Sequence, residues 1–453
     1  MKTKRISLFI ATIFILQLFF TVGASAAQVD GNYITSSGAC VMDYETGDIL
    51  YQYNGYNNRS PASMTKLMSL YCIFEALENK GISYNTVVPI SARAHSMPVT
   101  TDLQCIPLYY DRGYTVHQLI GAVATFSAAN AVIALVEFVA GSEKEFVKIM
   151  NSTAKRMGLN ATYYDACGAA TNSISPVSMA HLARNIITDY PQIIDYTSKS
   201  SITFNGSKYS TTNKLLTTYY YDGAEGLKTG TSSTAGACFC GTAVRSGERV
   251  ITVTMGSSGG NTRFTDTISL MNYGFKRINQ LYPEKLCCAY SKIYMNGYKI
   301  PALEYMNKGI SKPVIFIEDL QNYGFDVTYD DNSRVLKAVI NPNKEIKPLA
   351  SGEYDGKYGT KMARASLCKD VTVIINNGVF DITMDTVYLS KNKHAVYVEE
   401  FGNIFNLYWN GETSETDIVY TNYSPRGNDC SFVSAKLKKS YVIDKCLTFK
   451  TEG

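Results

Sequence analysis

The chain has 453 residues, of which 45% are apolar and 18% charged, and this balance excludes a disordered chain, a collagen-like chain and a protein with many membrane spans. At about 150 residues per domain, the length predicts two or three domains. The formal net charge is only +4, which gives no electrostatic reason to expect a nucleic-acid partner.

The N-terminus has the three parts of a signal peptide. Lys2, Lys4 and Arg5 form a basic start, and an apolar stretch over residues 6–22 follows. Ala24-Ser25-Ala26 then supplies the small residues of a cleavage site. An uncleaved anchor helix is the alternative. We predict removal of residues 1–26 and export to the cell wall and the outer face of the cytoplasmic membrane.

The next segments predict strands and helices in a defined order. Apolar-rich runs around Glu45-Thr46-Gly47 predict a hairpin over 36–54. Pro61 and Ser63 begin a helix with an apolar face that ends at Lys80-Gly81. Further predicted elements are helices over 116–125, 129–139, 143–157, 177–188 and 264–281, and a second hairpin with strands over 236–244 and 249–256.

This order predicts an α/β (α+β) fold. An early hairpin, a helical middle, a late hairpin and a closing helix indicate an antiparallel sheet covered by helices, with a helical subdomain inserted. After Pro283 the chain becomes rich in β-branched and aromatic residues between Asn, Gly and Asp turns, which predicts a β-rich C-terminal half. Residues 342–361 are the expected internal linker.

A serine and a lysine three residues apart are the candidate nucleophile and base. Ser63 and Lys66 share one face at a helix N-terminus, where free N–H groups can stabilise an oxyanion. The same Ser-x-x-Lys pattern starts at Ser152, Ser366 and Ser390, so the pattern alone decides nothing. Only the first copy follows a hairpin and opens an apolar helix. Burial there would lower the pKa of Lys66 toward that of a usable base.

Two further segments have chemistry that fits this pair. Lys228-Thr229-Gly230 occurs once, directly before the late hairpin. On an edge strand Lys228 and Thr229 can hold a carboxylate, and Gly230 lets a substrate approach the backbone. The charge of Lys228 would further lower the pKa of Lys66. Ser127 lies between two predicted helices, where its hydroxyl can relay a proton.

These motifs, in this order after a signal peptide, resemble the serine D-alanyl-D-alanine carboxypeptidases, the low-molecular-mass penicillin-binding proteins. The resemblance covers about residues 34–282. It extends along VMDYETGDILYQYNGYNNRSPASMTKLMS, ATFSAANAVIALVEFVAGSEKEFVKIMN, AEGLKTGTSSTAGACFCGTAV and RFTDTISLMNYGF. It implies the penicillin-binding protein/β-lactamase-like transpeptidase fold, with an antiparallel sheet flanked by helices.

The resemblance also implies catalytic roles and partners. Ser63 attacks the D-Ala-D-Ala peptide bond, Lys66 accepts its proton, and Ser127 helps to protonate the departing D-alanine. The implied substrate is a peptidoglycan stem peptide ending in D-Ala-D-Ala, and β-lactam antibiotics are implied ligands.

The implied binding residues lie late in the same segment. Lys228 and Thr229 bind the terminal carboxylate, beside Gly230. The backbone N–H groups of Ser63 and Thr231 form the oxyanion hole. Arg263 either supports the carboxylate pocket or forms a surface ion pair.

The sequence departs from the family at two places. The family's middle motif is Ser-x-Asn, and Ala129 stands at the Asn position, with Asn130 one residue later. The missing amide removes transition-state contacts that are worth about a few kcal/mol, unless a local shift lets Asn130 substitute as a substrate-binding residue. Cys167 stands at the position of a family His, either as a reactive thiol or as a small buried residue.

We therefore expect a serine D-Ala-D-Ala carboxypeptidase that trims stem peptides through an acyl-enzyme on Ser63. Because of Ala129, a catalytically impaired penicillin-binding-like protein that binds cell-wall peptides is the alternative. A β-lactamase is a third reading, but residues 162–177 lack the deacylating glutamate that a class A enzyme needs. The four histidines have no ligand spacing, so we expect no metal and no other cofactor.

The whole chain is expected to divide into a signal peptide (1–26), a carboxypeptidase-like domain (27–284), a small α+β module (285–345) and a β-rich region of unknown role (346–453). Residues 292–341 resemble the small repeat domain related to the N-terminal domain of copper amine oxidases, without copper ligands, and serve as a spacer or a glycan-binding module. We expect no C-terminal membrane anchor, because no terminal amphipathic helix follows.

The eleven cysteines leave at least one thiol unpaired in any intramolecular scheme. Those of the carboxypeptidase-like half, where small apolar residues would serve, are Cys40, Cys72, Cys105, Cys167, Cys238 and Cys240. A largely reduced set in an exported protein would indicate an anaerobic producer.

Overall fold

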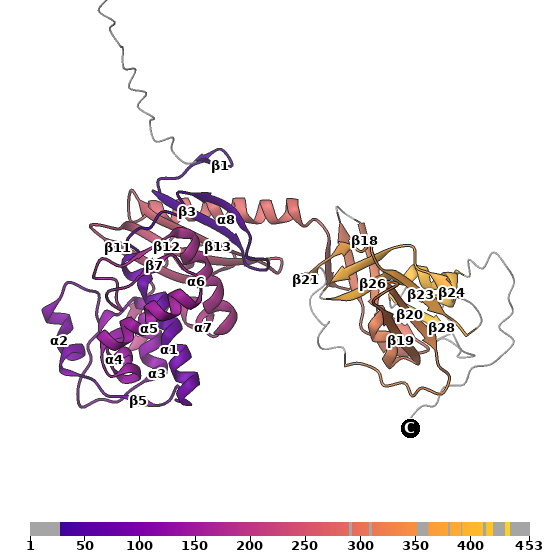
Figure 1. The fold of residues 1–453 in the computed structure, drawn as a ribbon, viewed down its shortest axis with the longest axis horizontal. Coiled ribbons are helices and arrows are strands. Elements are labelled where there is room, and N and C mark those ends of the chain that lie inside the picture. The colour runs from indigo at the N-terminus through magenta and orange to yellow at the C-terminus, as the bar shows by residue number, and fades with distance from the viewer. Residues whose placement is uncertain are drawn as a thin grey trace, which may run out of the picture.

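The computed structural model describes residues 28–289, 292–307, 310–350, 361–378, 381–390, 392–410, 414–419 and 431–434. The predicted signal peptide lies outside these ranges. Figure 1 shows two units that meet where helix α8 (Thr262–Leu281) ends. We call residues 28–284 the N-terminal unit and residues 285–434 the C-terminal unit.

The N-terminal unit is built on an antiparallel sheet with strand order β11-β12-β13-β3-β4. Its strands are β3 (Gly38–Asp43), β4 (Ile49–Tyr53), β11 (Ala224–Ser232), β12 (Gly236–Arg245) and β13 (Glu248–Ser257). The early hairpin is β3-β4 and the late hairpin is β12-β13, so both predictions are confirmed. Strand β11 carries Lys228 at one edge of the sheet, as expected.

The helices follow the predicted order. They are η1 (Ala62–Thr65), α1 (Lys66–Lys80), α2 (Ala92–Thr100), α3 (Val116–Gly121), η2 (Ala122–Phe126), α4 (Ala129–Ala140), α5 (Glu143–Arg156), α6 (Pro176–Asp189), α7 (Ile193–Thr197), η3 (Lys214–Leu216) and α8. The expected single helix over 116–125 is divided, because its second half, η2, is a π-helix. Short strand pairs are β1 (Gln28–Val29) with β2 (Asn32–Tyr33), β5 (Val87–Val88) with β6 (Tyr114–Thr115), β7 (Ala161–Thr162) with β8 (Ser173–Ile174), and β9 (Ser201–Phe204) with β10 (Ser207–Ser210).

The sheet lies between two helical layers. Alternate residues of β3 point to opposite faces, so Cys40 and Met42 join the core formed with α1 and α4, whereas Val41 packs under α8. At Gly274 of α8 a Cβ atom would lie 2.8 Å from Cγ1 of Val41 and 3.0 Å from Cγ1 of Val250. The absence of a side chain there lets α8 lie directly on the sheet (Figure 1).

The described part of the C-terminal unit has three sheets, ordered β21-β14-β17-β18-β26-β25-β22, β16-β15-β28-β27-β29 and β19-β20-β23-β24. Their bounds are β14 (Lys285–Cys288), β15 (Lys292–Met295), β16 (Tyr298–Ile300), β17 (Leu303–Asn307), β18 (Ile310–Phe316), β19 (Phe325–Asp330), β20 (Val335–Ile340), β21 (Lys361–Arg364), β22 (Ser366–Leu367), β23 (Thr372–Asn376), β24 (Asp381–Thr383), β25 (Val387–Ser390), β26 (Lys393–Tyr397), β27 (Asn406–Asn410), β28 (Glu415–Val419) and β29 (Ser431–Ser434), with 3-10 helices η4 (Ile317–Asn322) and η6 (Val398–Asn403).

Every one of these sheets combines strands from both sides of residue 345. The expected boundary between modules 285–345 and 346–453 is therefore wrong as a division into separate structural units, because hydrogen bonds between strands join the two segments. The resemblance of the first segment to the copper amine oxidase repeat stays a prediction.

The C-terminal unit consists of two similar halves related by an approximate two-fold axis. Each half runs hairpin, hairpin, 3-10 helix, hairpin: β15-β16, β17-β18, η4, β19-β20, then β23-β24, β25-β26, η6, β27-β28. The axis passes through the β18-β26 pair, where Ile315 faces Val396. Each half exchanges its first hairpin, because β15 lies parallel to β28 of the second half and β23 lies parallel to β20 of the first.

Side-chain contacts repeat this symmetry. Lys312 of the first half lies 4.8 Å from the ring centre of Tyr397, and Lys393 of the second half lies 5.5 Å from that of Phe316. The same two lysines form ion pairs across the axis, Lys312 with Glu399 and Lys393 with Asp319. The described strands between residues 372 and 419 thus form a second copy of the module before residue 345.

In the part of the chain that the structure describes, the free thiols include those of Cys40, Cys72, Cys105, Cys167, Cys238, Cys240 and Cys368. Its helices include none that is both long enough and apolar enough to span a bilayer.

Candidate active site

Ser63 and Lys66 meet where the 3-10 turn η1 continues into α1. This junction brings the Lys66 side chain back over Ser63, and Nζ of Lys66 donates a hydrogen bond to Oγ of Ser63 at 2.8 Å. A second hydrogen bond, at 2.7 Å, goes from the same Nζ to the carbonyl oxygen of Cys167. Lys66 is only 1% exposed, so the predicted pair is held in a protected setting.

The two buried lysines of the site both have lowered pKa values. Burial lowers the pKa of Lys66, although Cys167, Asp165 and Cys105 oppose the shift. The pKa of Lys228 falls well below the usual lysine value, first through burial and then through the charges of Lys66 and Arg263. The lowering of the Lys66 pKa that burial predicts is confirmed, whereas the charge of Lys228 is not among its causes and Lys66 instead lowers the pKa of Lys228. An uncharged amine beside Ser63 is therefore more accessible than in an exposed lysine.

Strand β11 brings the Lys-Thr-Gly motif against the nucleophile. Lys228 is 1% and Thr229 5% exposed. A Cβ atom on Gly230 would lie 2.4 Å from the carbonyl oxygen of Pro61 and 3.2 Å from the backbone nitrogen of Ser63. The glycine is therefore required by close packing of β11 on η1, a reason different from the expected approach of a substrate.

Ser127 lies between η2 and α4, as its position in the sequence predicts. It ends the π-helix in the left-handed region, with φ of 72°, and its N–H donates to the carbonyl oxygen of Val123 at 3.1 Å. A non-glycine residue in this conformation is uncommon and concentrates at functional sites. The side chain is 4% exposed.

Arg263 binds the end of β11 instead of a surface carboxylate. Its Nη1 donates to Oγ1 of Thr231 at 2.7 Å and to the carbonyl oxygen of Gly230 at 2.9 Å. Burial lowers the pKa of this guanidinium. Arg263 thus fixes the position of Thr231, whose N–H is the second implied oxyanion donor.

Asn130 faces away from the predicted site. Its Oδ1 accepts from the N–H of Ile106 at 3.2 Å, and its Nδ2 donates to the carbonyl oxygens of Ile106, at 2.6 Å, and Ala94, at 3.3 Å. The Asn130 side chain is fully buried, and its hydrogen bonds hold the loop before Ser127. The prediction that Asn130 substitutes for the family amide is therefore wrong. Ala129 contributes only a methyl group at the motif position.

Cys167 is a buried structural residue. It is 3% exposed, and burial raises the pKa of its thiol to about 12. Its Sγ lies 3.5 Å from the carbonyl oxygen of Ala129, to which it donates. Of the two interpretations, the small buried cysteine is confirmed. Cys167 contributes to the site through its backbone carbonyl oxygen, which accepts a hydrogen bond from Lys66.

Sequence reasoning missed three polar residues that shape the site. Asp165 accepts hydrogen bonds from the backbone N–H groups of Cys167, Gly168 and Ala170, which folds the loop toward Lys66. Asn172 donates to Oγ1 of Thr65 at 3.0 Å and closes the same loop. An Asp followed by small residues is a turn signal that could have identified Asp165. Thr212, the third, accepts from Oγ1 of Thr229 at 2.7 Å.

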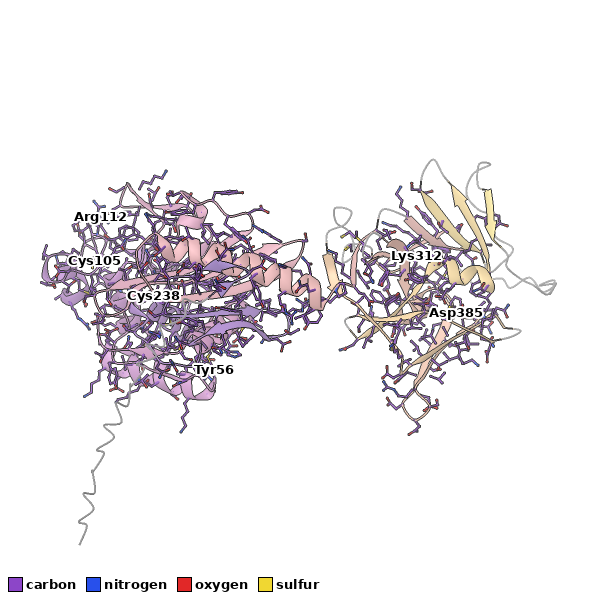
Figure 2. The ribbon with its side chains drawn as sticks, turned by 90° about the horizontal axis from the view of Figure 1, so that it is seen from above. Tyr56, Cys105, Arg112, Cys238, Lys312 and Asp385 are labelled. Atoms are coloured by element: carbon purple, nitrogen blue, oxygen red, sulfur yellow. The ribbon has the colours of Figure 1, made fainter. Side chains whose placement is uncertain are left out.

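Figure 2 places Cys105 at the end of the N-terminal unit that lies away from the C-terminal unit. Within the described ranges, no group of three or more His, Cys, Asp or Glu side chains could hold a metal ion.

Comparisons with known proteins give a consistent result for this unit. Residues 24–259 match the family model described as D-alanyl-D-alanine carboxypeptidase. The chain is 28% identical to D-alanyl-D-alanine carboxypeptidase DacF of Bacillus subtilis, over 74% of this chain and 87% of that protein. It is 30% identical to DacD of Salmonella typhimurium, over 60% of this chain and 72% of that one.

A solved structure agrees with these matches. The crystal structure of a peptidoglycan synthesis regulatory factor (PBP3) from Streptococcus pneumoniae is 31% identical, with a TM-score of 0.52, over 62% of this chain and 87% of that one.

Proposed function

The chain belongs to the D-alanyl-D-alanine carboxypeptidase family, and on that basis we propose that it is an active serine D-Ala-D-Ala carboxypeptidase that trims peptidoglycan stem peptides. The observation that carries the proposal is the contact of 2.8 Å between Nζ of Lys66 and Oγ of Ser63 in a buried site. A serine nucleophile requires a base, and Lys66 can act as that base because burial lowers its pKa.

The reaction proceeds in two stages. Oγ of Ser63 bonds to the carbonyl carbon of the penultimate D-alanine, and its proton passes to Lys66. The bond to the terminal D-alanine breaks, and that amine leaves with a proton delivered through Ser127. Water then hydrolyses the ester, which regenerates Ser63 and releases the shortened peptide.

The neighbouring strand supplies binding and charge stabilisation. Lys228 and Thr229 hold the terminal carboxylate, and the backbone N–H groups of Ser63 and Thr231 receive the developing oxyanion. Arg263 acts through Thr231, since its guanidinium is already bonded to that hydroxyl. A β-lactam acylates the same serine. The predicted signal peptide supports the proposal that this activity is exported from the cytoplasm.

A second candidate is a wall-binding protein with impaired catalysis. It is favoured by Ala129 and by Asn130, because neither offers an amide to the substrate or to Lys66. The loss of such a contact would reduce the rate by about one to three powers of ten.

The two candidates are separated by release of D-alanine from diacetyl-Lys-D-Ala-D-Ala. The full chain should release D-alanine, and the Ser63→Ala variant should not. Release by neither protein, together with unimpaired binding of the peptide, would establish the wall-binding protein instead. Labelled penicillin on Ser63 provides an independent check of the nucleophile.

A further inference from the structure

Thr212 connects two elements of the proposed active site, strand β11 and the π-helix η2. Its side chain contacts Thr229 of β11, with 2.7 Å between the two Oγ1 atoms. Its backbone N–H donates to the carbonyl oxygen of Thr125 at 3.2 Å. Thr125 lies in η2, the π-helix that ends at Ser127. One residue therefore touches both the carboxylate-binding strand and the element that presents the proton relay.

The segment around Thr212 is held firmly. The N–H of Thr211 donates to the carbonyl oxygen of Ser200 at 2.9 Å, and Leu215 is fully buried. Asn213 accepts from the N–H of Leu215 at 3.0 Å and caps η3. Thr212 itself is partly exposed, between these fixed neighbours. Its hydroxyl thus has a defined position beside Thr229.

The direction of the Thr212–Thr229 hydrogen bond matters for binding. A hydroxyl has one proton, and in the free protein Thr229 donates that proton to Thr212. A carboxylate can only accept, so Thr229 must turn its proton toward the substrate. Thr212 can then donate to Thr229 in return, which keeps the Thr229 oxygen satisfied and strengthens its donation to the carboxylate.

We propose that Thr212 is a positioning residue that selects substrates with a free C-terminal carboxylate, by holding Thr229 and reversing their shared hydrogen bond when the carboxylate arrives. This inference rests on the proposed function of Thr229 as a carboxylate ligand. It distinguishes a peptide ending in a carboxylate from the same peptide ending in an amide.

Kinetics on the full chain test the inference. Thr212→Val should raise KM for diacetyl-Lys-D-Ala-D-Ala about fivefold, with kcat changed by less than about twofold, because the lost contact acts equally in substrate and transition state. Thr212→Ser should restore KM.

For the C-terminal amide of this peptide, wild type and Thr212→Val should have equal KM. The exposed Thr218→Val variant is the matched control. An unchanged KM in Thr212→Val, or a loss that Thr212→Ser does not repair, overturns the inference.

Binding without turnover separates this inference from the proposed activity. In the Ser63→Ala chain, Kd for the same peptide should rise about fivefold when Thr212→Val is added. If Kd rises in this way but wild type releases no D-alanine, the proposed activity is refuted and the role of Thr212 is retained. If wild type releases D-alanine but Thr212→Val changes neither KM nor Kd, the activity is retained and the role of Thr212 is refuted. No binding at all would refute both. A melting temperature equal to that of wild type shows that the variant is folded.

Discussion

Arg364 of the C-terminal unit forms a two-pronged ion pair with Asp43 of the N-terminal unit, 2.6 Å from Nη1 and 2.8 Å from Nη2. The Asp43 side chain is fully buried, and that of Arg364 is only 10% exposed. Arg364 also bonds Glu248 at 2.9 Å and covers the ring of Tyr282 at 4.1 Å. The C-terminal unit thus supplies the cation that pairs with two buried carboxylates at the end of the N-terminal sheet.

Removal of this arginine should destabilise the whole chain. Arg364→Met leaves Asp43 buried without its charge partner, which typically costs about 3–5 kcal/mol of unfolding free energy. Adding Asp43→Asn should recover part of the loss. Chemical denaturation of the full chain measures both effects. The exposed pair of Lys337 with Asp381 gives the control, and Lys337→Met should cost less than about 1 kcal/mol. Equal costs in the two variants would contradict the neutralising role.

The rate of Ser63 acylation should depend on the charge of Lys66. Only the uncharged amine accepts a proton, so acylation by labelled penicillin should rise with pH and level off below the usual lysine pKa of 10.5, since burial lowers the pKa of Lys66. Lys66→Arg, which stays charged, should slow acylation by about two to four powers of ten. Lys155→Arg, in a chance copy of the Ser-x-x-Lys pattern, should have no effect. A Lys66→Arg rate near that of wild type would exclude Lys66 as the base.

Lys228 should stabilise substrate binding at the expense of folding. Because its pKa is lowered well below 10.5, the folded chain disfavours its charge, and Lys228→Met should raise the melting temperature while it weakens peptide binding. The sign of the pH dependence follows from the lowered pKa. The stabilisation should be full at pH values below the lowered pKa of folded Lys228, shrink as the pH rises from that pKa toward 10.5, and be absent above 10.5, where unfolded lysine has also lost its proton. Thermal melts at several pH values measure this effect, with exposed Lys208→Met for comparison. A lower melting temperature for Lys228→Met than for wild type would show that Lys228 stabilises the fold.

Asn130 should affect stability more than substrate binding. Asn130→Ala removes three buried hydrogen bonds to Ile106 and Ala94, which should lower the unfolding free energy by about 2–4 kcal/mol. The exposed Asn85→Ala substitution is the control, with a change of less than about 0.5 kcal/mol. Denaturant titrations measure the difference. Unchanged stability with a selective rise in KM would instead identify Asn130 as a substrate-binding residue.

The sequence predicted the parts of the fold and site that depend on local pattern. Both hairpins, α1 and the helices α4, α5, α6 and α8 follow from apolar spacing and turn residues, and the contact of Ser63 with Lys66 follows from their separation on a helical turn. The spacing could not reveal which way a buried amide points, so Asn130 was misplaced. It also could not predict α2, because Pro98 lies inside that helix.

The C-terminal boundary was wrong for a different physical reason. Strand patterns report which residues alternate in burial, but they do not say which strand lies beside which. The halves around residue 345 are recognisable as repeats when PVIFIEDLQNYGF is set beside HAVYVEEFGNIFN, each with an acidic pair at the start of a 3-10 helix. The exchange of hairpins depends on contacts between segments far apart in the sequence, and comparing the two segments cannot predict those contacts.

The exchanged hairpins also set the order in which the C-terminal unit can fold. Among the described strands, the neighbour of hairpin β15-β16 is β28, more than a hundred residues later in the chain. A growing chain therefore holds this hairpin without its sheet until the second half is complete. Such distant contacts raise contact order and slow folding. Because of the exchanged hairpins, the two small modules fold together in one cooperative step, after the second module is complete.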